Sequence, residues 1–106
     1  MPSTWRRYEI LVPLQFNDGS EIPAAWLGEA TAEVFEHFGG VSFETQVIEG
    51  QWRSGGTTYR DELAKLVIDV PATAENRRWM KACRDRWKVR FRQVAIWLVS
   101  FTITVE

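Results

Sequence analysis

A chain of 106 residues with 45% hydrophobic and 13% aromatic content has the composition of one globular domain spanning residues 1–106, which excludes a disordered protein. Thirteen basic and fourteen acidic residues give a net charge of −1, which argues against a protein that is basic throughout and binds nucleic acid by charge alone. One cysteine and one histidine exclude an internal disulfide and a metal-ligand cluster, so we expect no metal and no cofactor. No apolar run reaches the length of a signal sequence or a membrane span, which predicts a cytoplasmic protein without a membrane partner.

The first elements predicted along the chain are a strand and a helix. Apolar and polar residues alternate in "RRYEILVPLQF", residues 6–16, as in a strand with one buried face. After a segment rich in turn residues, apolar residues three or four apart predict a helix from Pro23 to about Phe38. Gly39 and Gly40 would end it, because glycine adopts the left-handed conformation of a helix C-terminal cap at little cost.

A hairpin of two strands is predicted next. Residues 41–49 alternate, and so does "LAKLVIDV", residues 63–70, in which Leu63 and Asp69 share a face. The glycine-containing loop at positions 50 to 56 is short enough to join two antiparallel neighbours.

A second helix and a last strand complete the predicted fold. Thr73 is a helix-cap candidate before an apolar stripe with helical spacing, and "VAIWLVSFTITV", residues 94–105, reads as strand. The order strand, helix, strand, strand, helix, strand predicts the α+β class, as a ferredoxin-like βαββαβ plait: an antiparallel sheet with two helices on one face. The open face would carry Leu11 and Trp97, and an apolar open face is typical of a dimer or a ligand groove.

The predicted hairpin and the end of the first helix hold the candidate polar sites. Trp52 and Tyr59 either pack against each other across the hairpin or form the walls of a pocket in which Glu62 is a base. His37 follows Glu33 by four residues, so Glu33 is a neighbour that would favour the charged imidazole. His37 is then either a cap on a solvated face or a proton carrier.

The second predicted helix is strongly basic. Residues 77–92 carry eight basic side chains and one acidic one. A stripe along one side would track phosphates in a nucleic acid, and it consists of Arg77, Lys81, Arg84 and Lys88. The alternative is that these basic side chains form ion pairs with the glutamates of the first helix.

Three short motifs resemble a group of small uncharacterised bacterial and phage proteins. They are "HFGGVSFETQVIEGQW", "YRDE" and "FRQVAIW". The resemblance implies a ferredoxin-like fold, and it marks Trp52, Tyr59, Glu62 and Gln93 as site residues, with Gln93 as a hydrogen-bond donor to a ligand. Many such groups have an acidic residue after the glutamine, where this chain has Val94.

These features favour a non-enzymatic binding or assembly module that acts as a homodimer, because no catalytic motif is present and the last strand is apolar. One alternative is a small enzyme of the dimeric α+β barrel type that uses His37 or Glu62. Another is a protein that associates with nucleic acid through the basic second helix.

Overall fold

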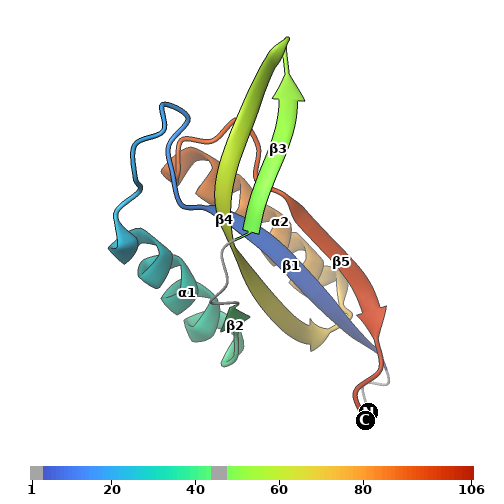
Figure 1. The fold of residues 1–106 in the computed structure, drawn as a ribbon. Coiled ribbons are helices and arrows are strands. Elements are labelled where there is room, and N and C mark those ends of the chain that lie inside the picture. Colours follow the sequence, from blue (N-terminus) through green and yellow to red (C-terminus); the bar gives the residue numbers. More distant parts are fainter. Residues whose placement is uncertain (1–3, 44–47) are drawn as a thin grey trace.

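The computed structural model describes residues 4–43 and 48–106, without the side chains at positions 59 and 60. The elements in chain order are β1 (Trp5–Pro13), α1 (Ala24–Phe38), β2 (Ser42–Phe43), β3 (Ile48–Ser54), β4 (Thr57–Pro71), α2 (Ala74–Arg90) and β5 (Leu98–Ile103). The strands form an antiparallel sheet in the order β2-β4-β1-β5, with β3 also paired to β4 (Figure 1).

The alternation of β1 and β4 gives the sheet one buried face. The buried residues of the two strands are cross-strand partners: Tyr8 with Ile68, Ile10 with Leu66, and Val12 with Ala64. Both helices add fully buried side chains to the same core, namely Ala30, Val34, Met80, Cys83 and Trp87. Burying each large apolar side chain contributes about 1.5–3 kcal/mol, so this core supplies most of the gross stabilisation.

Both helix ends follow the local signals predicted from the sequence. The backbone N–H of Gly39 donates to Phe35 O, and Gly39 has a φ of 78°, the left-handed conformation predicted for the cap. At the start of α2, the Thr73 side chain accepts a hydrogen bond from the backbone N–H of Asn76 at 3.1 Å. Such a cap is worth about 1 kcal/mol to the helix.

The prediction of a simple ferredoxin-like plait with two helices on one face is wrong, because the sheet is richer in strands and curls like half of a barrel. Of the strand predicted over residues 41–49, positions 42–43 are in β2 and 48–49 in β3, and residues 44–47 lie outside the described part of the structure. β4 begins six residues earlier than the strand predicted over residues 63–70. β2 pairs with β4 at Leu66 and Val67, whereas β3 pairs with residues 57–63 at its other end. Figure 1 shows β4 bending along its length, with β3 beside its upper half.

A two-residue turn explains why the hairpin is longer than predicted. Ser54 pairs with Thr57, and Gly55 and Gly56 between them have φ values of 57° and 80°. Positive φ at both central positions is typical of the type I′ turn, which joins strands directly. Gly55 and Gly56, which predicted a loop, therefore form the two-residue turn that joins β3 to β4.

Pro13 marks the point at which β1 stops and the hairpin continues alone. Pro13 pairs with Leu63, and the backbone N–H of Leu14 still donates to Glu62 O at 2.9 Å. Residues of β4 before Glu62 pair with β3 among the described strands. Proline has no N–H to extend a ladder.

Among the described residues, no helix is long and apolar enough to cross a membrane.

Candidate functional site

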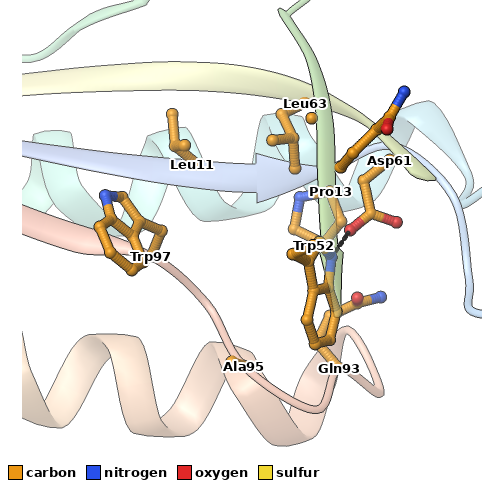
Figure 2. A pocket seen from close by; sticks show the side chains of 10 residues that line it. Leu11, Pro13, Trp52, Asp61, Leu63, Gln93, Ala95 and Trp97 are labelled. Carbon is orange, nitrogen blue, oxygen red and sulfur yellow. Dashed lines mark hydrogen bonds between the residues drawn. The ribbon is translucent and has the colours of Figure 1, made fainter. Parts of the chain in front are cut away.

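An apolar pocket opens on the sheet face that the core does not use. It has a volume of about 380 Å³ and lies between the end of β1, the β3–β4 hairpin and the segment that joins α2 to β5 (Figure 2). Its apolar lining consists of Leu11, Pro13, Trp52, Leu63, Ala95 and Trp97. Trp97 is 67% exposed, so a ligand in the pocket would cover a large aromatic surface that water now contacts.

The pleat of the hairpin puts the polar group of the pocket next to an indole. Gly50 pairs with Asp61 and Trp52 with the backbone at position 59, so all these positions lie on the Leu63 face of the ladder. Trp52 Nε1 donates to Asp61 Oδ2 at 2.6 Å, as Figure 2 shows. A hydrogen bond to a carboxylate is stronger than one between neutral groups, so it fixes the plane of the indole ring.

Gly50 keeps the space between these groups open. A Cβ atom added at Gly50 would lie 3.2 Å from Leu63 Cδ1, a closer approach than ordinary van der Waals contact. A side chain at this position would also project from the same face as Trp52, into the pocket that Gly50 lines. The glycine therefore has a steric role in the site.

The opposite face of the hairpin is acidic. Glu49 and Glu62 are cross-strand partners on this face, and they line a second hollow of about 270 Å³ beside the first. Asp61 lies on the pocket face and borders both hollows. Like charges directly opposite each other destabilise a ladder. No group of three or more metal-ligating side chains converges among the described residues.

The four residues marked by the sequence motifs separate into two groups. Trp52 and Gln93 line the apolar pocket, whereas Glu62 is exposed and lines the acidic hollow. The backbone of Tyr59 pairs with that of Trp52, and the prediction for the Tyr59 side chain lies outside the described part of the structure. The roles of Trp52, Glu62 and Gln93 in binding stay predictions.

Sequence reasoning missed Asp61 and Trp97 as site residues. It chose Glu62 from the acidic pair, although the alternation that groups Leu63 with Asp69 also places Asp61 on the open face. Trp97 was predicted only as part of the open face. Its backbone oxygen accepts from Leu11 N at 3.0 Å, which brings it beside β1 before β5 begins.

His37 lies at the end of α1 and does not line the pocket. Its ring stacks on Trp79 with centroids 4.1 Å apart and planes 5° apart. Glu33, expected to hold His37, instead accepts hydrogen bonds from Arg86 Nη2 at 2.6 Å and Arg90 Nη1 at 2.9 Å. The role of His37 as a proton carrier stays a prediction.

The basic stripe of α2 lies mostly in solvent. Arg77, Lys81 and Lys88 are exposed, and Arg84 is half-buried with its Nε 3.0 Å from Asp85 Oδ1. The residues of α2 that form salt bridges with Glu33 of α1 are Arg86 and Arg90, which lie on another side of the helix. Binding of nucleic acid to the stripe stays a prediction.

Cys83 is buried in the core of α2. Burial, with a smaller contribution from Glu33, raises the pKa of its thiol to about 12. A thiol with this pKa stays protonated near neutral pH and is a poor nucleophile. Cys83 thus acts as the small hydrophobic residue expected from its place on the apolar stripe.

No family model and no curated protein sequence matches the chain. Solved structures with a similar fold include a phage SAM lyase in complex with S-methyl-5'-thioadenosine, with a TM-score of 0.71 and 14% identity over 100% of this chain and 93% of that chain. The phage SAM lyase in the apo state has a TM-score of 0.68 and 15% identity over 98% and 92% of the two chains. CutA from Synechococcus elongatus has a TM-score of 0.61 and 12% identity over 96% and 79%.

At these identities the similarity shows a shared fold, that of small α+β proteins. The resemblance to a group of bacterial and phage proteins stays a prediction, since no family model supports it.

Proposed function

We propose that the apolar pocket binds S-adenosylmethionine and that the protein is a lyase that cleaves it to S-methyl-5'-thioadenosine. The observation that carries the proposal is a pocket with two tryptophans and one carboxylate, Asp61, on a chain whose fold matches a phage SAM lyase over its full length. This proposal differs from the sequence-based preference for a non-enzymatic module, because the sequence did not predict that these groups meet in one pocket.

The chemistry of the ligand complements that of the pocket. S-adenosylmethionine has a positively charged sulfonium, and a cation near an indole face gains about 0.5–1 kcal/mol at an exposed site and about 2 kcal/mol when water is excluded. Asp61 adds an opposite charge, and its hydrogen bond to Trp52 keeps the carboxylate and the indole together. The adenine ring is a flat surface that stacks well on the Trp52 indole, which leaves the Trp97 face for the sulfonium, with Asp61 attracting the charge from the Trp52 end of the pocket (Figure 2).

Cleavage removes the charge that the site attracts. When the bond between sulfur and the γ-carbon of the amino-acid chain breaks, both electrons stay on sulfur and the sulfonium becomes a neutral thioether. The carboxylate of the same amino-acid chain forms the new bond to that carbon, so the second product is a five-membered lactone and no further reactant is needed. Asp61 and the indole faces bind the charged substrate, and the apolar lining keeps water away from the reacting carbon. The neutral product then loses its attraction to Asp61 and to the indole faces, which favours release.

Calorimetric titration with S-adenosylmethionine tests binding at this site. Trp97→Ala should weaken binding about tenfold, the loss expected for one aromatic contact with a cation. S-adenosylhomocysteine, which has a neutral sulfur, should bind more weakly than S-adenosylmethionine.

Phe35→Ala is the matched control, because Phe35 is an exposed aromatic residue of α1 that does not line the pocket. Wild-type protein that binds no S-adenosylmethionine at millimolar concentration would refute the proposal. If the wild type and Trp97→Ala bind S-adenosylmethionine with equal affinity, the binding site does not include Trp97 and lies elsewhere on the protein.

We also propose that copies of the chain associate through β5, as a homodimer. β5 has only β1 beside it among the described strands, and Phe101 on its outer face is 44% exposed. An edge strand with exposed apolar side chains favours pairing with a second copy. Light scattering of the wild type and of Phe101→Lys tests this association.

A further inference from the structure

The side chain of Gln93 has a fixed place in the pocket wall. α2 ends in a turn in which Arg92 has a φ of 55°, and the backbone N–H of Gln93 donates back to Lys88 O at 2.9 Å. A left-handed residue other than glycine costs about 1 kcal/mol, and such strain is often found near functional sites. The turn leaves Gln93 7% exposed and directed to the pocket that it lines.

Hydrogen bonds define which way the Gln93 amide faces. Its Nε2 donates to Phe91 O at 2.9 Å and to Gln15 O at 3.3 Å. Both partners are backbone carbonyl oxygens, which only accept, so rotating the amide by 180° would bring its oxygen against two acceptors. The two protons of the amide nitrogen are therefore already engaged within the protein.

The atom of Gln93 that remains for a ligand is its oxygen, an acceptor. No described residue donates to Oε1. Among the described residues, the buried side-chain atom without a partner is Tyr8 OH, so Oε1 is in contact with solvent. We expected the Gln93 amide to donate to a ligand, but its N–H groups donate to two backbone carbonyl oxygens of the protein instead. A ligand that offers an N–H to Oε1 gains a hydrogen bond, whereas one that offers a second acceptor leaves the oxygen unpaired at a cost of about 1–3 kcal/mol.

We infer that Gln93 selects the base of the bound nucleoside, by accepting a hydrogen bond at Oε1 from the 6-amino group of adenine. Figure 2 shows Gln93 and Trp52 at one end of the pocket and Trp97 at the other, so a base that stacks on Trp52 would have its edge near the amide. The inference rests on the proposed function. It predicts that the site prefers a 6-aminopurine to a 6-oxopurine.

Two ligands that differ only at the 6-position test this inference on the wild-type protein. S-methyl-5'-thioadenosine carries the amino group, and S-methyl-5'-thioinosine carries a carbonyl oxygen in its place. Calorimetry should give at least about tenfold weaker binding of the inosine compound, because two acceptors then face each other.

Substitutions show whether Gln93 is the group responsible. Gln93→Met removes the acceptor at similar size and should reduce the preference to about twofold or less. Gln51→Met is the matched control: Gln51 also borders the pocket, but strand alternation directs its side chain to the opposite face of β3 from Trp52. Gln51→Met should keep the preference.

The outcomes separate this inference from the proposed function. Equal binding of the two ligands to the wild type overturns the role of Gln93 and leaves the site intact, whereas binding of neither overturns both. A preference that survives in Gln93→Met, or that disappears in Gln51→Met, assigns the selection to another residue. If Gln93→Met does not fold, as circular dichroism would reveal, equal binding of the two ligands to the wild type still overturns the inference.

Discussion

Glu33 joins the two helices through a single carboxylate. Its oxygens accept hydrogen bonds from Arg86 and Arg90. Glu33 Oε2 also accepts from Nε1 of Trp87, a fully buried core residue, at 3.3 Å. Burial alone would raise the pKa of Glu33, but the hydrogen bonds from Arg86, Arg90 and Trp87 outweigh it and leave the pKa below its ordinary value of 4.5. The carboxylate is thus more stable as an anion in the folded protein than in the unfolded chain.

Replacing Glu33 should destabilise the protein in a pH-dependent way. We expect Glu33→Gln to lower the free energy of unfolding by about 1 kcal/mol at neutral pH, a modest loss because both arginines are partly exposed. A depressed pKa contributes stability above the unfolded value, and that contribution disappears as pH falls through the folded value. The difference between wild type and variant should therefore shrink below about pH 4.5.

Urea unfolding at pH 7 and at pH 3 measures both effects. Glu29→Gln, an exposed glutamate on the same helix, is the control and should cost little at either pH. A Glu33→Gln penalty that is the same at both pH values would contradict the assigned role of the carboxylate.

The hairpin and β5 form the half of the sheet that carries function. β3 and the first part of β4 extend past Pro13, so Trp52 and Asp61 stand beyond the end of β1 and wall the pocket. β5 has the half-buried residues Leu98 and Ser100 on its core side and apolar residues on the outer side, at Val99 and Phe101. The same outer face begins at Trp97, so an interface on β5 would adjoin the pocket.

Self-association through β5 has a measurable consequence. Wild-type protein should scatter light as a species of twice the chain mass of 12.3 kDa, and Phe101→Lys should shift it to a monomer, because a charge in an apolar interface is costly to desolvate. Val105→Lys is the control, since Val105 is 66% exposed and lies beyond the end of β5. A wild-type monomer at all concentrations would rule out this interface.

The fold of the whole molecule was predictable where local signals decide it. α1, α2, their caps and the alternation of β1 all followed from spacing and from residues such as Gly39 and Thr73. The sheet was not, because β2 and β3 pair with different parts of β4. Pairing partners are set by tertiary contacts that a local pattern does not contain.

The candidate site was predictable only in part, for a related reason. Trp52 and Gln93 are separated by 40 positions of the chain, and their meeting depends on the long hairpin and on the turn after α2. Asp61 was within reach of sequence reasoning, since the two-residue period assigns it to the open face. Its hydrogen bond to Trp52 was not, because side-chain geometry decides that contact.

Conversion of S-adenosylmethionine by the purified protein tests the central claim most directly. Incubation followed by liquid chromatography should show S-methyl-5'-thioadenosine accumulating well above the rate of spontaneous decomposition in buffer. Trp97→Ala and Asp61→Asn should each lower that rate, since they remove an aromatic contact and the carboxylate of the pocket, and Phe35→Ala should not. A rate with the wild-type protein equal to that in buffer would contradict the account.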